Sequence, residues 1–513
     1  MKLQAPESKH WRSRDLAFGP WVFDVSLDLG VWRLALPWLL GFCCCLGQPV
    51  SAQTVLGEPQ ERIIHYEAPG PLADPVARLQ RCLADGSAKL NFDAARGGYL
   101  PSLLQALGIH NSSQGLVFSK TSTQRERINP GTPRAVYFGD DAYVGFVPGG
   151  PEMEIISVDP TRGPIFYTLE QKADALPVFS RRADCMQCHL GPRTLNVPGL
   201  VVRSIYTATN GIPLAPVEGF INGHNSPLEK RWGGWYVTGT HLRTVRDEPD
   251  DREPPSPLPI GWGEGSRVRG LLAVHRSGGG DLHLGNVFST DPSHPDQVDL
   301  SAGANVTDLR ARFDTSRYLS PHSDLVALLV LEHQVRMQNL ITRANYETLY
   351  ALDERADGPA PAGGGAWPEQ RIARAGEMLL EYMLFRNEAP LHGPLKGTSA
   401  FTAEFQLDGP RASKGRSLRQ LDLDTRLLRY PCSFQIYSPA FAALPPEMKN
   451  YLWRRLQEIL TGQDHTPTYA SLSTHDRQDI LEILQETKTE FKSWLVNHPN
   501  GPTIAARPHV LTF

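Results

Sequence analysis

The chain has 513 residues, of which 41% are hydrophobic and 21% are charged. This is the composition of a globular protein with room for more than one domain, and it excludes disorder over most of the length. The formal net charge of −4 leaves no basic excess, so we expect no nucleic acid among the partners.

The N-terminal segment has the pattern of a secretory signal. Basic residues precede the apolar run LALPWLLGFCCCLG at 34–47, and Val50-Ser51-Ala52 matches a small-residue cleavage site. The run is too short to span a membrane as a helix. We expect residues 1–52 to be a signal peptide, which makes the mature chain periplasmic or otherwise exported, without a transmembrane span. An uncleaved N-terminal membrane anchor is the alternative.

A mixed N-terminal segment at 53–130 is followed by a region at 131–320 with the pattern of short antiparallel strands. AVYFGDDAYVGFV contains two β-rich runs around a Gly-Asp-Asp turn, and MEIISV and IFYTL flank the turn DPTRGP at 159–164. VVRSIYTATNGIPL has Asn210-Gly211 where a type I′ hairpin turn would place it. This region is therefore predicted to be antiparallel β.

The pattern becomes helical in the region 321–513. SDLVALLVLEHQVRMQNLITRANYETLYAL begins with the capping candidates Ser323 and Asp324 and is too long for a strand. Three further helices are predicted at EQRIARAGEMLLEYMLFR, PPEMKNYLWRRLQEIL and THDRQDILEILQETKTEFKSWL. The predicted fold class is α+β, with an antiparallel β-rich half and a C-terminal helical layer.

The segment RRADCMQCHLGPR at 181–193 carries Cys185, Cys188 and His189. C-x-x-C-H is the attachment sequence of c-type haem, in which the two thiols add to the porphyrin vinyl groups and the histidine ligates the iron. The sequence predicts one covalent haem c, attached at Cys185 and Cys188, with His189 as the proximal ligand. The export signal supports this interpretation, because such haem is attached after secretion.

Two other chemistries use closely spaced cysteines. A zinc site needs further ligands, and the chain has no second C-x-x-C and no H-x₃₋₅-H pair. A redox dithiol normally begins a helix of a βαβ unit, whereas this pair lies in β-rich sequence between Pro177 and Gly191. Both alternatives are weaker than haem.

On Cys185, Cys188 and His189 the chain resembles the c-type cytochromes. Small members of that family carry the motif near the end of an N-terminal helix in an all-helical domain, whereas here it lies deep in a β-rich segment. The resemblance therefore implies the cofactor, without that fold or its distal methionine loop. The segments FYTLEQ, CMQCH, GLVVRSIY, RWGGWYVTGTH and HLGN are similar to a poorly characterised group of exported monohaem proteins.

The ligand on the other side of the iron separates the possible functions. A second protein ligand favours electron transfer, and an open face allows chemistry on a small molecule. His333 and Met337 are four residues apart on one predicted helix face, although each is also explained as ordinary core packing. His224, His241 and His283 are further distal candidates, because each lies beside a turn in the β-rich half.

We expect electron transfer with a redox partner that the sequence does not identify. A haem enzyme, peroxidase-like or oxidising a small substrate, is the alternative, and a binding module with an incidental haem is the third hypothesis. Arg193 and Arg203 follow the motif closely enough to pair with haem propionates. We expect Cys82 and Cys432 either to form a disulfide in the exported compartment or to remain as two buried free thiols.

Overall fold

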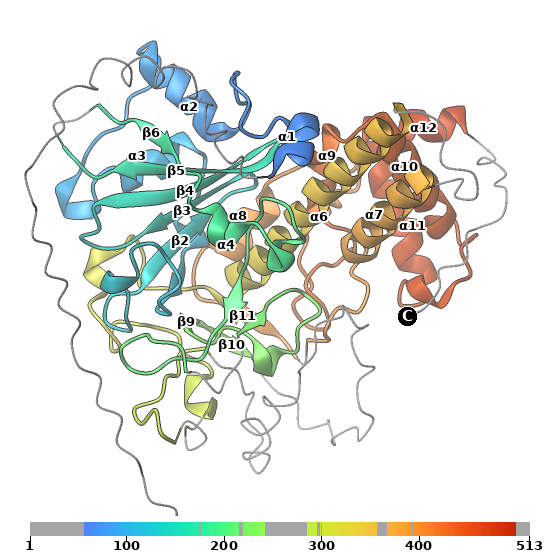
Figure 1. Cartoon of the computed structure of the whole chain (residues 1–513). Coiled ribbons are helices and arrows are strands. Elements are labelled where there is room, and N and C mark those ends of the chain that lie inside the picture. The colour runs from blue at the N-terminus through green and yellow to red at the C-terminus, as the bar shows by residue number, and fades with distance from the viewer. Residues whose placement is uncertain are drawn as a thin grey trace, which may run out of the picture. The chain divides into compact units, whose positions relative to one another are not determined.

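The structure is a computed structural model, and it describes residues 56–173, 176–214, 219–241, 285–294, 298, 300–356, 367–391 and 393–498. Residues Thr54–Phe513 form one compact unit. The predicted signal peptide at 1–52 and the distal candidate His283 lie outside the described residues. The predicted α+β class is confirmed (Figure 1).

A seven-stranded antiparallel sheet with the order β6-β5-β4-β3-β2-β1-β9 lies at the centre of this unit (Figure 1). Its strands are β1 (Gly115–Val117), β2 (Arg134–Phe138), β3 (Ala142–Phe146), β4 (Glu152–Asp159), β5 (Gly163–Glu170), β6 (Phe179–Arg181) and β9 (Trp235–Tyr236). Two small antiparallel sheets pair β7 (Arg203–Ser204) with β8 (Phe220–Ile221) and β10 (Gly239–His241) with β11 (Leu395–Gly397).

Two of the three hairpins predicted from the sequence, β2–β3 and β4–β5, form the middle of the sheet. In the β4–β5 turn, the Asp159 carboxylate accepts hydrogen bonds from the backbone N–H groups of Thr161 and Arg162. Gly163 follows with a φ of 76°, which glycine adopts without a steric penalty. The β2–β3 turn is held to the next layer by Gln334, whose side-chain amide donates to the Gly139 carbonyl oxygen.

Short helices from the N-terminal part of the chain cover one face of the sheet. They are α2 (Pro75–Ala84) and α3 (Leu100–Ala106), whereas α1 (Glu58–Ile64) contacts the long helix at Leu325–Ala356. Tyr137, Val144 and Ile155 of the sheet share a buried cluster with Val76 of α2 and Leu103 of α3. Since side chains alternate between the two faces of a strand, the intervening residues point to the opposite face.

The long helix α6 (Leu325–Ala356) packs on that opposite face, where Phe138, Tyr143 and Val158 share its buried cluster. Asp324 caps it by accepting hydrogen bonds from the first backbone N–H groups, as predicted. Nearly every part of α6 is buried, because further helices enclose its other sides. The helices that contact α6 are α7 (Trp367–Met383), α8 (Phe401–Leu407), α9 (Pro439–Ala442) and α10 (Pro446–Leu460). Behind them, α10 contacts α11 (Thr474–Thr487) and α12 (Thr489–Asn497).

Two local predictions differ from the structure. The last predicted helix is divided into α11 and α12 at Lys488, whose φ of −115° and ψ of 87° are not helical. Just before this break, the Thr487 hydroxyl bonds back to the Ile483 carbonyl oxygen, a contact that bends helices. The hairpin expected at Asn210-Gly211 is reduced to an isolated bridge between Thr207 and Pro213.

Candidate haem site

The helical turn α4 (Met186–His189) holds the cysteine motif beside the sheet and α6 (Figure 1). Cys185 immediately precedes this turn, and its carbonyl oxygen accepts a hydrogen bond from the His189 backbone N–H at 3.1 Å. Met186 points into the core, Cys185 is half-buried and Cys188 is exposed. The three residues of the predicted haem attachment are thus brought together on one turn.

Gly199 fixes the orientation of the His189 ring. Nδ1 of His189 donates a hydrogen bond to the Gly199 carbonyl oxygen at 2.8 Å, and the Gly199 N–H donates to the His189 carbonyl oxygen at 2.9 Å. The ring also packs against Phe166 of β5, with 4.8 Å between ring centroids. Nε2 of His189 makes no hydrogen bond to any residue that the structure describes, so this nitrogen remains for a metal.

The loop that carries Gly199 is in turn fixed to α6. Asn339 accepts a hydrogen bond from the Leu200 N–H at 2.9 Å and donates one to the Leu200 carbonyl oxygen at 2.7 Å. A Cβ atom on Gly199 would lie 2.6 Å from Oδ1 of Asn339 and 2.8 Å from Cβ of Thr194. Glycine is therefore the residue that allows the loop to approach the helix this closely.

The electrostatics of the motif differ from those of a catalytic dithiol. Burial, reinforced by the neighbouring Asp184 and Glu154 carboxylates, raises the pKa of Cys185 to about 11. Redox-active C-x-x-C pairs need a lowered thiol pKa, so the structure disfavours that alternative. Burial also lowers the pKa of His189, which keeps its ring neutral, the form that ligates metals.

Two arginines lie close to the exposed end of the motif. The pKa of Arg203 is lowered by burial and by the neighbouring positive charge of Arg193, while Cys188 lies near enough to raise it. Among the residues that the structure describes, the buried Nε of Arg203 has no hydrogen-bond partner and the exposed Arg193 guanidinium makes no ion pair. An arginine pair with unused donors fits the carboxylates of a haem.

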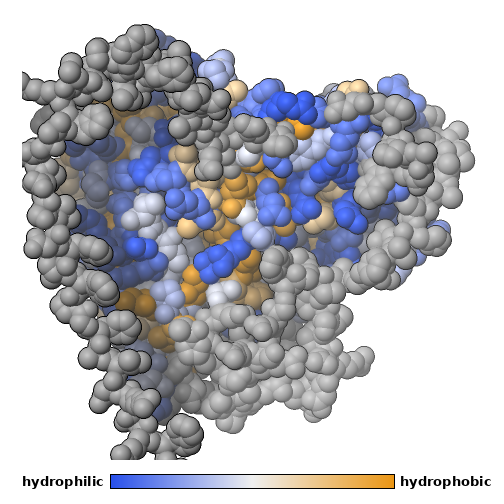
Figure 2. Space-filling model, viewed as in Figure 1, coloured by the Kyte–Doolittle hydropathy of each residue, from blue (hydrophilic) through white to orange (hydrophobic). Residues whose placement is uncertain are grey.

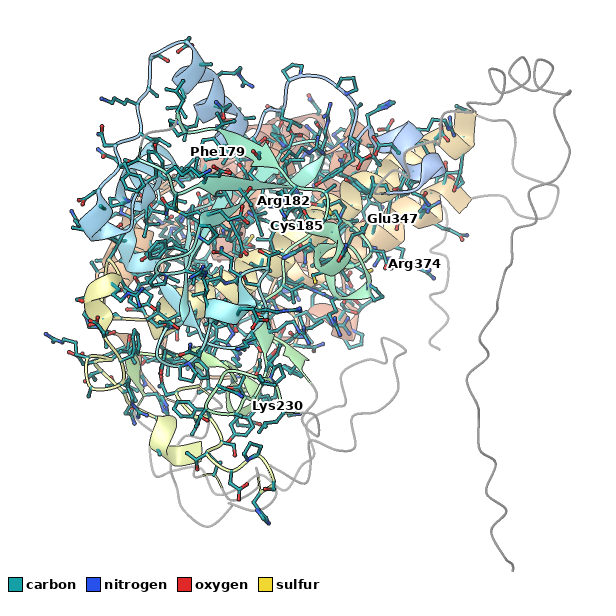
Figure 3. All side chains as sticks on the ribbon, turned by 60° about the vertical axis from the view of Figure 1, so that its left-hand side comes forward. Phe179, Arg182, Cys185, Lys230, Glu347 and Arg374 are labelled. Carbon is teal, nitrogen blue, oxygen red and sulfur yellow. The ribbon has the colours of Figure 1, made fainter. Side chains whose placement is uncertain are left out.

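The surface around α4 contains both apolar and charged residues. Figure 2 shows the molecule from the same side as Figure 1. Apolar residues reach the surface in the middle of the face seen there, with hydrophilic residues on both sides. Figure 3 shows Cys185 beside Arg182, which forms an ion pair with Asp184 at 2.7 Å. A porphyrin needs this combination of apolar contact for its ring and charged partners for its edge.

Two of the distal candidates contact each other in the interior. The Nδ1 atoms of His224 and His333 lie 2.9 Å apart, and Nε2 of His333 lies 2.8 Å from the Ser433 hydroxyl. Both rings stack near Phe385, and the ring centroids of His224 and Tyr382 are 3.9 Å apart. Burial lowers the pKa of His333 to about 3. Both ring nitrogens of His333 are thus engaged within the protein.

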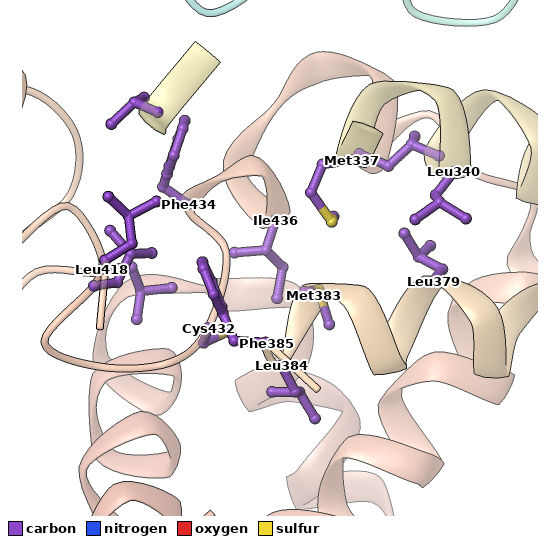
Figure 4. Packing of buried hydrophobic residues seen from close by; sticks show 14 of the residues in the cluster. Met337, Leu340, Leu379, Met383, Leu384, Phe385, Leu418, Cys432, Phe434 and Ile436 are labelled. Carbon is purple, nitrogen blue, oxygen red and sulfur yellow. The ribbon is translucent and has the colours of Figure 1, made fainter. Parts of the chain in front are cut away.

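The other two distal candidates that the structure describes are also buried. Met337 is a buried residue of α6 and lies in the core near Leu340 of the same helix and Met383 of α7 (Figure 4). His241 lies on β10, and its backbone N–H donates to the side-chain oxygen of Asn305 at 2.8 Å.

The predicted Cys82–Cys432 disulfide is wrong, because both residues are free thiols. Cys82 is half-buried on α2, one of the N-terminal helices that cover the sheet. Cys432 is completely buried in the cluster around α6. The alternative of two free thiols holds, although Cys82 is only half-buried.

Sequence reasoning missed Gly199, Asn339 and Phe166, which orient His189. None of the three left a signal in the sequence, because their roles depend on contacts between distant segments and, for Gly199, on a backbone carbonyl oxygen. Comparison of the chain with protein-family models, curated proteins and solved structures finds no match. Among the described residues, no group of three or more His, Cys, Asp and Glu side chains is placed to hold a metal ion, and no helix is long and apolar enough to cross a membrane.

Proposed function

We propose that the chain is an exported c-type haem protein that transfers single electrons. One haem c would be attached through thioethers at Cys185 and Cys188, with His189 as the proximal iron ligand. The observation that carries the proposal is the hydrogen bond from Nδ1 of His189 to the Gly199 carbonyl oxygen, which leaves Nε2 as the coordinating atom. The N-terminal signal pattern supports the exported location.

The bound haem would supply a one-electron iron couple, and the protein residues would position the macrocycle and set its surroundings. Gly199 and Phe166 hold the His189 ring, and Arg193 and Arg203 supply donors for the propionates. Cys188 is exposed, so the edge of the haem attached there would face solvent, where a redox partner could approach. This exposure is the observation that supports electron transfer.

A haem enzyme with an open iron face is the second candidate. It is favoured by the contacts of His333, since both of its ring nitrogens are hydrogen-bonded inside the protein and it could ligate iron only after losing one of these bonds. Adding carbon monoxide to the reduced, mature protein separates the two candidates. An unchanged low-spin spectrum supports electron transfer, and ready binding of carbon monoxide supports an enzyme.

The attachment itself is tested by two double variants produced with haem-maturation machinery. The Cys185→Ser/Cys188→Ser variant should lose all haem that survives denaturation. The matched control, Cys82→Ser/Cys432→Ser, also removes two free thiols but leaves the motif intact, so it should retain covalent haem. Covalent haem in the first variant, or no haem in the native protein, would overturn the proposal.

A further inference from the structure

A second site, away from the cysteine motif, lies at the β2–β3 turn. A cavity of about 580 Å³, here called the hairpin cavity, opens to the surface there and is lined by residues of α2, the segment after α3, the turn itself and α8. This volume is within the range of small-molecule sites. The two sites lie at opposite ends of β2. His189 is close to Arg134, the first residue of the strand, whereas Phe138, the last residue, lines the hairpin cavity.

Apolar side chains form much of the hairpin cavity. Leu79 and Leu107 line it on the N-terminal side, and Phe138, Phe401 and Phe405 line it on the other side. The three aromatic rings are in contact, with centroid distances of 5.6 Å both for Phe138 with Phe401 and for Phe401 with Phe405. They form a contiguous aromatic part of the lining, which can contact an apolar ligand body.

The positive groups of the hairpin cavity already have partners in the protein. Arg419 forms an ion pair with Asp140, and its guanidinium lies 4.8 Å from the Phe405 ring centroid. Arg78 donates a hydrogen bond to the Ala73 carbonyl oxygen. An anionic ligand would compete with these contacts and meet further carboxylates in the lining.

The carboxylate of Asp141 forms no ion pair with any residue that the structure describes. It accepts no hydrogen bond from any residue that the structure describes, although the Asp141 carbonyl oxygen is bonded to the Val158 N–H. Burial and the adjacent Asp140 raise the pKa of Asp141 to about 7, even though Arg78 and Arg419 oppose this shift. A ligand cation would offset the unpaired negative charge.

The remaining charged residues in the lining add to the negative balance. Glu404 accepts a hydrogen bond from the Ser112 hydroxyl and lies 3.7 Å from Nδ1 of His110, while Asp408 is exposed at the edge. The lining thus contains four carboxylates, including Asp140 and Asp141, against two guanidinium groups. This excess disfavours an anion.

We propose that the hairpin cavity binds an organic cation, with an ammonium group at Asp141 and an apolar body along Phe138, Phe401 and Phe405. Coulombic attraction to the carboxylate and contact with the aromatic rings would act on the same ligand. This site is independent of the haem proposal, because its residues and chemistry are separate from those of the motif.

Isothermal titration of the full chain at pH 8, where Asp141 is mainly ionised, tests the proposal. The probes share one phenyl body: 2-phenylethylamine is the cation, 2-phenylethanol the neutral analogue and 3-phenylpropionate the anion. We expect the amine to bind at least tenfold more tightly than the other two. Asp141→Asn should remove at least nine-tenths of that selectivity, whereas Asp408→Asn at the exposed edge should change it less than threefold.

The wild-type comparison decides the proposal even where the Asp141 variant does not fold. No binding of the amine at millimolar concentration would overturn the site, and equal or tighter binding of the carboxylate would overturn its cation preference. A folded Asp141→Asn variant with unchanged selectivity would overturn the role of Asp141. Circular dichroism of each variant establishes whether it is folded.

Discussion

Replacing Asn339 with Leu tests whether α6 holds the loop that orients His189. Leucine has the same branching and the same number of side-chain heavy atoms but no amide, so both hydrogen bonds to Leu200 are lost. Asn339 is 1% exposed and Leu200 is 5% exposed, so water cannot easily replace the lost partner. The Leu200 N–H and carbonyl groups are then left unsatisfied in the interior.

The expected cost follows from those two backbone groups. Each buried group without a partner destabilises the fold by about 1–3 kcal/mol, so the loss is about 2–6 kcal/mol in the free energy of unfolding. Asn345→Leu is the matched control, because Asn345 lies on the same helix and makes one hydrogen bond, to the Thr161 carbonyl oxygen at 2.7 Å. Its expected cost is about half as large.

Urea unfolding followed by circular dichroism measures both losses. Under the proposed function, the reduction potential of the protein loaded with haem reports on the iron ligand His189. Asn339→Leu should shift this potential because the Gly199 carbonyl oxygen is no longer held beside Nδ1 of His189, whereas Asn345→Leu should leave it unchanged. A loss below about 0.5 kcal/mol for Asn339→Leu, well under the cost of one unsatisfied group, would refute the reasoning. So would an equal potential shift in both variants.

Three further outcomes are expected. Without reductant, a thiol-alkylating reagent should label Cys82 in the native protein and Cys432 only after unfolding, whereas two unlabelled cysteines after unfolding would contradict the free thiols. Burial raises the pKa of Glu388 to about 7 from 4.5, so the folded state holds a proton that the unfolded state releases, and stability falls as pH rises from about 4.5 to 7. Glu388→Gln should reduce the loss of unfolding free energy between pH 5 and pH 8 by at most about 3 kcal/mol, measured by urea unfolding. An unchanged pH dependence would contradict the assignment of this loss to Glu388. Phe166→Ala should cost about 3–5 kcal/mol in thermal unfolding because the 2% exposed ring is lost from beside His189, and a loss near zero would show that the ring does not support the site.

The elements with strong local signals could be predicted from the sequence. The turn residues around Gly139 and Asp159 determine the two central hairpins, and the apolar run after the Asp324 cap determines α6. Long-range pairings left no such signal. The placement of β9 beside β1 joins Val117 to Trp235 and depends on tertiary contacts.

The same division applies to the candidate site. C-x-x-C-H predicts a cofactor from five consecutive residues, and the structure places those residues on one helical turn. The contact of His224 with His333 joins positions 109 residues apart, so treating them as separate ligand candidates missed their pairing. The role of Gly199 also required the backbone, because its carbonyl oxygen, which every residue possesses, contacts His189.

The anchoring of Leu200 by Asn339 has a consequence for the order in which the protein matures. The two residues are 139 positions apart, so the cysteine motif is synthesised well before the helix that fixes its loop. Until α6 packs, the loop lacks this anchor, whereas Cys188 is exposed even in the complete fold. Under the proposed function, His189 would therefore take its final orientation only once α6 has packed.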